Sequence, residues 1–297
     1  MKCHYGTTVV DLHIHSNYSD GTRSPKKIVA LAQKAGLKAI ALTDHDTVAG
    51  VDEFLKYAAK TKLTVSPAIE VTSFQMGVEV HILGYGINHA HRNIGNLFLK
   101  NIEARRERLN RTLELLDKHG IIQATEAEIA DWFNYDGPVI SIYHLIEYVS
   151  RMLRRNFLEV KKLFKRGGVA WVSYDYSKLL SADEAVRIIT RELGGVAVLA
   201  HPGKILKAAS YGEEYFHQNS WHILHVLLSD LKREGLGGIE SFHPAHDQAQ
   251  QENLVAISKK LGLHNTAGSD FHGGKFKKNK KLGMPGIGTA DFLSLIS

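Results

Sequence analysis

Residues 9–50 decide the fold, and they read VVDLHIHSNYSDGTRSPKKIVALAQKAGLKAIALTDHDTVAG. An apolar run ends in His13 and His15, which lie two positions apart, so in a strand both imidazoles point to the same face and can bind one ion. A second apolar run, 38–42, ends just before His45. We interpret the stretch as the start of a metal site, because two strand ends rich in His and Asp have little packing rationale as buried structural residues.

A helix is predicted between these two runs. Ser24 is suited to the N-cap and Pro25 to the first helical position, and the helix should end near Gly36. Asp20 precedes this helix in a turn. A strand, a helix and a second strand, with polar residues at the strand ends, form the repeating unit of open α/β sheets and barrels, which carry their chemistry at that edge.

Later segments repeat the pattern of an apolar strand that ends in side chains able to bind a metal. They are 63–71 with Glu70, 78–87 with His81, 195–199 with His201, 237–242 with Glu240, His243 and His246, and 264–273 with Asp270 and His272. The strands of Glu70 and His81 should be neighbours, because the connection between them is short. Six or seven such β-α units are typical of a barrel.

The middle of the chain, residues 96–189, has a different character. Its helical periodicity is rich in Arg, Lys and Glu, and no long strand-like alternation occurs. We predict a mostly helical insertion here, in a discontinuous barrel made of residues 1–95 and 190–297. The insertion's His119 and His144 are expected to be surface or core residues rather than ligands.

The composition indicates a globular protein without a membrane span. The chain has 297 residues, 44% hydrophobic and 23% charged, and no window reaches the roughly 18 consecutive apolar residues of a spanning helix. The first residues lack the apolar core of a secretory signal, so we expect a cytoplasmic protein. The single cysteine, Cys3, excludes an internal disulfide and leaves His and carboxylates as metal ligands, which favours hard or borderline divalent ions.

The charge balance is compatible with an anionic partner. The net charge is +6, and the chain contains 17 histidines, which suits an anionic substrate or nucleic acid. Two basic runs, 151–166 and 275–281, contribute much of this charge. Runs of this kind are usually solvated faces, although the second run closely follows Asp270 and His272.

The strand-end residues together offer nine oxygen and nitrogen donors. They are His13, His15, Asp20, His45, Glu70, His81, His201, Asp270 and His272. One ion takes about four to six protein ligands or fewer, so nine donors imply two or three ions. Close divalent ions polarise phosphoryl oxygens and lower the pKa of a shared water to make hydroxide, so phosphate ester hydrolysis is the expected reaction. We expect Glu70, Asp270 and His201 to act in catalysis, the two carboxylates as bridges between ions.

The motifs DLHIHSNYSDG (11–21), LTDHDT (42–47), VHILGY (80–85), LAHP (199–202) and GSDFHG (268–273) together resemble the polymerase and histidinol phosphatase (PHP) family of metal-dependent phosphoesterases. Within it, the chain looks most like stand-alone nucleoside 3',5'-bisphosphate phosphatases and 5'-3' exoribonucleases with a helical insertion. The resemblance implies a distorted (β/α)7 TIM-like barrel with up to three manganese, zinc or iron ions.

The family pattern also implies how the donors divide among the ions. One ion would take His13, His15, Glu70 and Asp270, a second Glu70, His81 and His201, and a third Asp20, His45 and His272. Glu70 would therefore bridge the first two ions.

One departure from the family pattern concerns the substrate. The family often has an Arg-Pro-His segment in the insertion, whereas this chain reads GPVISIYH at 137–144, without the arginine that could bind a second phosphate. Lys204 and Arg166 are candidate substitutes, with ordinary solvated charge as the alternative. His243 and His246 are candidates either for contacts to phosphate or for support of the metal ligands.

Three functions are compatible with these observations. The preferred one is a phosphoesterase acting on a nucleotide, a phosphorylated small molecule or a short oligonucleotide. The second is a small-molecule phosphomonoesterase of the histidinol-phosphatase kind. The third is a non-catalytic, metal-stabilised scaffold that binds RNA through its basic segments.

Overall fold

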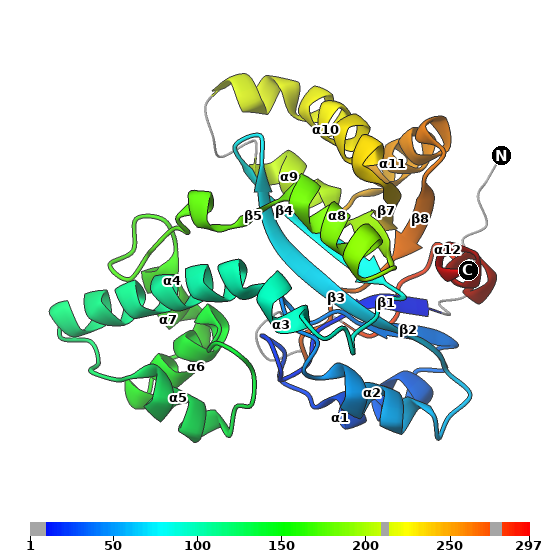
Figure 1. Cartoon of the computed structure of the whole chain (residues 1–297). Helices are drawn as coiled ribbons and strands as arrows, with labels where there is room; N and C mark the ends of the chain where they lie inside the picture. Colours follow the sequence, from blue (N-terminus) through cyan, green and yellow to red (C-terminus); the bar gives the residue numbers. More distant parts are fainter. Residues whose placement is uncertain (1–9, 209–213, 274–280) are drawn as a thin grey trace.

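The computed structural model describes residues 10–208, 214–273 and 281–297 and is built around one mixed sheet (Figure 1). The strands follow the order β1-β2-β3-β4-β6-β7-β8, and β5 pairs with β3. Their bounds are β1 Val10–Ile14, β2 Ala39–Leu42, β3 Thr64–Gln75, β4 Val78–Tyr85, β5 Leu180–Ser181, β6 Val196–Leu199, β7 Leu236–Phe242 and β8 His264–Ala267. Each apolar run expected to form a strand does so.

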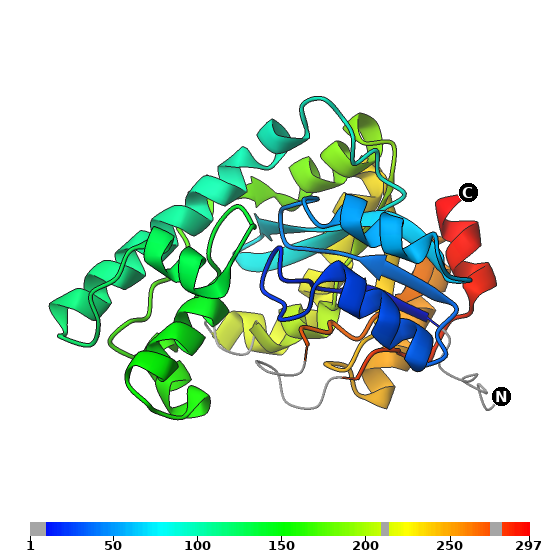
Figure 2. The ribbon, with the colours of Figure 1, turned by 90° about the horizontal axis from the view of Figure 1, so that it is seen from below.

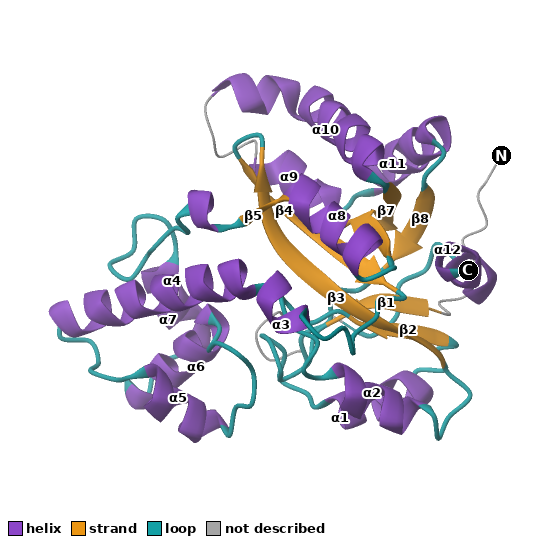
Figure 3. Cartoon of the chain, in the orientation of Figure 1, coloured by secondary structure: helices purple, strands orange, loops and turns teal. Residues whose placement is uncertain are grey.

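Helices surround this sheet, as the secondary-structure colours of Figure 3 show. They are α1 Pro25–Lys34, α2 Val51–Ala58, α3 Ile94–Leu97, α4 Leu99–Lys118, α5 Glu126–Phe133, α6 Ile142–Met152, α7 Phe157–Val160, α8 Ala182–Arg187, α9 Pro202–Ala208, α10 Glu214–Glu234, α11 Gln248–Leu261 and α12 Thr289–Ile296. Three short turns complete the described elements: η1 Lys161–Phe164, η2 Tyr176–Lys178 and the π-helical η3 Ile188–Glu192.

The sheet closes into a distorted barrel, as the sequence predicted. Strands β1, β2 and β3 are parallel, as are β6, β7 and β8, whereas β4 runs antiparallel to both β3 and β6. This reversal follows from the tight turn between β3 and β4, where Met76 and Gly77 have φ angles of 51° and 81°. The barrel closes where Ile14 pairs with Phe271, just beyond β8, and His15 N donates to Phe271 O at 2.9 Å.

Local sequence signals explain how the first unit forms. The Ser24 side chain accepts a hydrogen bond from Lys27 N, and Pro25 occupies the first turn of α1, as expected from their types. Both faces of β1 and β2 are buried, which is typical of parallel strands covered by helices. The Phe292 ring of α12 packs against Tyr85, with ring centroids 6.0 Å apart, in a cluster that includes Val10 and Ala39, the first residues of β1 and β2. The carboxyl ends of the strands are therefore left for the site.

Helices α4 to α7 form a lobe beside the barrel (Figures 1 and 2). This lobe has its own hydrophobic cluster, in which Leu109, Leu116, Ile129 and Leu145 are almost fully buried. No helix among the described residues is long and apolar enough to cross a membrane. Of the basic run 275–281, only Lys281 lies within the described residues, so its expected role stays a prediction.

Candidate metal centre

One end of the barrel brings the nine predicted ligands together: it is the carboxyl end of the parallel strands and, because β4 is antiparallel, the amino half of β4, where His81 lies. His13 lies on β1, Glu70 on β3 and His81 on β4, and the other six lie in the segments that follow β1, β2, β6 and β8. All are buried or nearly so, and His45 and His81 have the most exposed side chains, at 13% and 12%. A Cβ at residue 268 would collide with the Cβ of His13, so glycine is required where β8 passes β1.

The first group of donors surrounds Glu70 Oε2. His13 Nε2 and His15 Nε2 each lie 3.1 Å from this oxygen, and they lie 3.1 Å from one another. Asp270 Oδ1 lies 3.5 Å from His15 Nε2 and 4.0 Å from His13 Nε2. Lone pairs at this spacing repel each other unless a proton or a cation lies among them.

The second group faces the other oxygen of Glu70. His81 Nδ1 lies 2.7 Å and His201 Nε2 lies 2.9 Å from Glu70 Oε1. Because its two oxygens face two different sets of imidazoles, Glu70 has the geometry of a bridging carboxylate.

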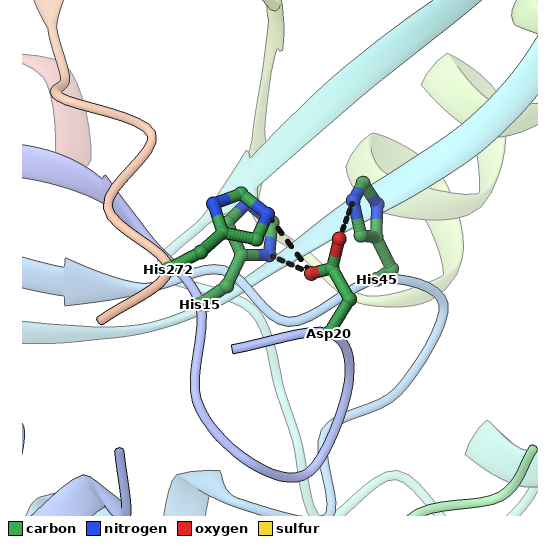
Figure 4. Close-up of side chains that lie close together, drawn as sticks. All are labelled: His15, Asp20, His45 and His272. Atoms are coloured by element: carbon green, nitrogen blue, oxygen red, sulfur yellow. Dashed lines mark ion pairs between the residues drawn. The ribbon is translucent and has the colours of Figure 1, made fainter. Parts of the chain in front are cut away.

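The third group consists of His15, Asp20, His45 and His272, which Figure 4 shows converging on the Asp20 carboxylate. Asp20 Oδ1 lies 2.9 Å from His272 Nε2 and 3.7 Å from His15 Nδ1, and Oδ2 lies 3.8 Å from His45 Nε2. His15 therefore presents one ring nitrogen to the first group and the other to the third group.

Unpaired buried atoms are concentrated in this cluster. Among the described residues, buried side-chain atoms without a hydrogen-bond partner include His15 Nδ1, Asp20 Oδ1, His45 Nδ1, Glu70 Oε2, His201 Nδ1 and His243 Nε2. Buried polar atoms in folded proteins almost always have a partner. Five of these atoms belong to predicted ligands and fit a site that binds metal ions, and the sixth, His243 Nε2, lies beside them.

A second layer of carboxylates orients the ligands. Glu240 is fully buried, and its Oε1 accepts from His13 Nδ1 at 3.0 Å while its Oε2 accepts from His201 N at 2.7 Å. Glu79 Oε1 lies 3.0 Å from His81 Nε2. Such contacts fix the ring and leave the other nitrogen for the metal. The sequence marked Glu240 as a strand-end residue but did not indicate this role.

Three further aspartates hold the loops of the site. Asp11 accepts from Ser269 N at 2.9 Å, and Asp44 accepts from Ser16 N at 2.7 Å. Burial raises the pKa of both carboxyls to about 6. Asp46 instead connects the barrel to the lobe, because Arg105 of α4 donates to its Oδ2 at 2.7 Å.

The protonation of the cluster is uneven. Burial alone would lower the pKa of His13, but the carboxylates of Glu70 and Glu240 raise it to about 10. Burial likewise opposes a charge on His81, but the carboxylate of Glu70 raises the pKa of His81 to about 9. Burial, with nearby His272, lowers the pKa of His15 to about 4. Burial also holds the pKa values of His45 and His201 well below the ordinary range.

Two of the predicted substrate contacts lie at the cluster. Lys204 Nζ donates to Asp270 Oδ2 at 3.0 Å, and its side chain is 42% exposed. His243 Nε2 lies 3.5 Å from Asp270 Oδ2, while its Nδ1 accepts from Ala245 N at 2.9 Å. A neutral imidazole that accepts at Nδ1 has its proton on Nε2, so His243 presents a donor and not a metal ligand to the site.

The other two predicted contacts are placed differently. Both ring nitrogens of His246 bond to backbone, Nδ1 to Ser241 O and Nε2 to Gly203 N, each at 2.9 Å. His246 therefore supports the loop after His201 and has no nitrogen left for substrate. Arg166 is exposed and follows η1 in the lobe.

A cavity of about 600 Å³ adjoins the third group of donors. Gly21 and Gly273, the neighbours of Asp20 and His272, line its barrel side together with Arg23. Its opposite wall comes from the lobe and contains Phe133, Asn134, Tyr135 and His144. Aromatic rings and a guanidinium are suited to a phosphorylated organic molecule.

Comparisons with known proteins agree with this geometry. Residues 11–171 match the PHP domain family. A phosphoribosyl 1,2-cyclic phosphate 1,2-diphosphodiesterase from Eggerthella lenta is 32% identical over 282 residues, which cover 93% of this chain and 98% of that protein. A 5'-3' exoribonuclease from Haemophilus influenzae is 28% identical over 90% of each chain. A solved amidohydrolase from Chromobacterium violaceum, with bound sulfate and no metal, has a TM-score of 0.77 at 26% identity, covering 94% of this chain and 91% of that chain.

Proposed function

The chain belongs to the PHP domain family and is a metal-dependent phosphoesterase, and from this premise we propose that it hydrolyses phosphate esters of nucleotides. The substrates we propose are nucleoside 3',5'-bisphosphates and the 5' ends of short RNA. The observation that carries the proposal is the convergence of nine donors, five of which (His15, Asp20, His45, Glu70 and His201) have a buried atom without a hydrogen-bond partner. The similarity to an exoribonuclease supports the choice of substrate class.

We assign the ligands to three ions, which we propose to be manganese, zinc or iron. His13, His15, Glu70 and Asp270 hold the first, Glu70, His81 and His201 the second, and Asp20, His45 and His272 the third, with His15 beside it. When bound, such ions polarise phosphoryl oxygens and lower the pKa of water at the site. This chemistry requires Glu70 and Asp270 as carboxylates and His201 as a neutral imidazole, and burial keeps His201 neutral by lowering its pKa.

The protein's own donors position the phosphate. Lys204 is half-exposed beside Asp270, so its ammonium can turn from this carboxylate to an oxygen of the substrate. His243 is buried and carries its proton on the nitrogen that faces the same carboxylate. Burial lowers the pKa of His243 to about 4, so it acts as a neutral hydrogen-bond donor. Together these two side chains bind the anionic group without adding a metal ligand.

A screen that detects both inorganic phosphate and released nucleoside monophosphates tests the proposal, because cleavage at the 5' end of RNA leaves the phosphate on the released nucleotide. The purified protein is loaded with each divalent metal in turn and given nucleoside bisphosphates, nucleoside monophosphates, 5'-phosphorylated short RNA and sugar phosphates. We expect release from the nucleotides or RNA and loss of at least about 100-fold in rate for His13→Ala, since one missing ligand disrupts the first ion. The proposal would be overturned if no metal supported release of phosphate from any nucleotide or of a mononucleotide from any RNA.

A second candidate function is cleavage of a cyclic phosphodiester of a ribose phosphate. It is favoured by the similarity to the Eggerthella lenta relative, whose activity is on a phosphoribosyl cyclic phosphate. Comparing the kcat/KM of a ribose cyclic phosphodiester with that of a nucleoside 3',5'-bisphosphate decides between the two candidates.

A further inference from the structure

On the β3–β4 hairpin, the face that carries the proposed metal ligands also carries further side chains, nearer to the tip of the hairpin. Alternate residues of a strand share a face, so Glu70, Thr72 and Phe74 lie on one face of β3. Their cross-strand partners are Leu83, His81 and Glu79 on β4. Phe74 and Glu79 therefore lie one step further from the barrel than the ligand His81, on the same face.

Aromatic rings cover this end of the hairpin face. The Tyr176 ring of η2 stacks on Phe74, with centroids 4.2 Å apart and an angle of 14° between the planes. The ring centroid of Tyr174 lies 6.5 Å from that of Tyr176, and the Arg108 guanidinium lies 4.4 Å above the Tyr174 ring. We call Phe74, Tyr174, Tyr176 and Arg108 the aromatic surface.

Packing of the protein interior does not account for the aromatic surface. Its three rings belong to none of the buried hydrophobic clusters of the described residues, and Tyr176 is 37% exposed. The segment that carries Tyr174 and Tyr176 runs along α4 before β5 joins β3 (Figure 1). Phe74 and Tyr174 are half-buried and Tyr176 is exposed. One pair of these rings stacks and the third lies under a guanidinium, beside a phosphoesterase site, which points to a ligand with flat faces and negative charge.

The charges around the aromatic surface fit such a ligand. Arg108 Nε donates to Val172 O at 2.9 Å, and no carboxylate of the described residues forms an ion pair with Arg108. The exposed Arg111 lies one turn further along α4. The acidic group on the hairpin face, Glu79, is paired with His81 Nε2. Phosphates are therefore attracted to the α4 side of the surface, where the guanidinium groups lie.

We propose that the aromatic surface stacks the bases of a single-stranded oligonucleotide whose scissile phosphate lies at the metal centre. This inference rests on the proposed function. It means that the enzyme prefers oligonucleotides to mononucleotides as substrates. Proteins that bind single strands combine stacking rings with cationic side chains in this way. The cavity at the third group of donors accepts one nucleoside, and the aromatic surface beside His81 accepts the nucleotides beyond the scissile phosphate.

The inference is tested with Tyr176→Ala, Tyr176→Phe and Arg108→Gln. Binding of a fluorescent single-stranded oligoribonucleotide of about six nucleotides is measured by anisotropy on chelator-treated protein, so that no cleavage occurs. We expect Tyr176→Ala to raise the Kd about tenfold, because one stacking contact is lost, and Tyr176→Phe to keep the Kd within about twofold. Arg108→Gln should reduce the slope of log Kd against log salt by about one phosphate contact.

A matched control variant is Tyr57→Ala. Tyr57 of α2 also has cations over its ring, since Lys26 and Lys60 lie 5.3 Å and 5.6 Å from the centroid, but α2 lies on the outer side of the barrel (Figure 1). Its removal should leave the Kd unchanged. Thermal midpoints of all variants show whether each is folded. An equal loss of binding for Tyr57→Ala, or an unchanged Kd for both Tyr176→Ala and Arg108→Gln, overturns the inference.

Kinetics on the metal-loaded protein separate this inference from the proposed function. Tyr176→Ala should lower the kcat/KM for the oligoribonucleotide about tenfold and that for a nucleoside 3',5'-bisphosphate less than about twofold. If both fall equally, the aromatic surface is not a contact for nucleotides beyond the scissile phosphate. If the wild type cleaves neither substrate but binds RNA through Tyr176, the proposed function fails and the aromatic surface stands as a binding site.

Discussion

Glu240 fixes the orientation of two proposed metal ligands, since it accepts from the His13 ring and from the His201 backbone. In Glu240→Gln the side chain keeps its shape but loses the charge that makes His13 a stronger ligand. We expect metal affinity to fall about 10- to 100-fold, as for other carboxylates that support a metal-binding histidine. Competition of the protein with a chelating dye measures this change.

The control for Glu240→Gln is Glu252→Gln, an exposed position on α11. Its metal affinity should equal that of the wild type. Equal affinity of Glu240→Gln and wild type would show that Glu240 supports only the fold around His13.

The sequence indicated the candidate metal ligands better than it indicated the residues that hold those ligands in place. His13 and His15 share a strand face, and His201 and Asp270 follow apolar runs, so local patterns placed them at one edge. The role of Glu240 depends on His13, which is 227 positions away in the chain. The available signal was a carboxylate in the apolar strand 236–242, because a buried acid needs a partner.

Besides the ion pair of Arg105 with Asp46, the buried amide of Asn101 joins helix α4 to the barrel. Asn101 Nδ2 donates to Asp46 Oδ1 at 2.7 Å and to Thr72 O at 2.6 Å, and its Oδ1 accepts from Leu180 N at 2.9 Å. In Asn101→Ala each of these buried groups loses one hydrogen bond, so we expect the free energy of unfolding to fall by about 1–3 kcal/mol. Chemical denaturation, followed by circular dichroism, measures the loss.

The same helix offers the control. Asn110 of α4 is exposed, and Asn110→Ala should change the free energy of unfolding by less than about 0.5 kcal/mol. If both variants unfold at the same denaturant concentration as the wild type, Asn101 does not join α4 to the barrel energetically.

At the element scale, periodicity identified the strands, the first helix and the helical character of the middle of the chain. The short β3–β4 connection also indicated that Glu70 and His81 are neighbours. Two features had no local signal. Strand β5 is two residues long, and the contact of Asp46 with Arg105 joins segments 59 positions apart, so only the folded barrel brings them together.

Metal binding by the whole protein should be coupled to the release of protons from the donor cluster. The pKa values of about 10 for His13 and about 9 for His81 mean that both imidazoles are charged at neutral pH without metal. The lowered pKa values of His15, His45 and His201 mean that these rings are already neutral. A histidine must be neutral to bind a metal, so His13 and His81 must each release a proton when metal binds.

The metal-free protein should also lose stability in alkaline solution. The folded-state pKa of His13, about 10, lies above its ordinary value of 6.5. The charged form therefore stabilises the fold fully below about pH 6.5, and this contribution is lost as the pH rises through about 10. Metal ions replace that charge, so the metal-loaded protein should keep its stability over the same range.

We therefore expect metal binding at pH 7.5 to release protons from His13 and His81, and metal affinity to increase as the pH rises toward 9. Calorimetric titration in buffers of different ionisation enthalpy counts the protons. His81→Gln should release one proton fewer than the wild type, because the amide that replaces the imidazole has no proton to give, whereas the exposed His119→Gln should match the wild type. If the wild type releases no protons, His13 and His81 are already neutral in the metal-free protein. The carboxylates around Glu70 then hold no charged imidazole in that state.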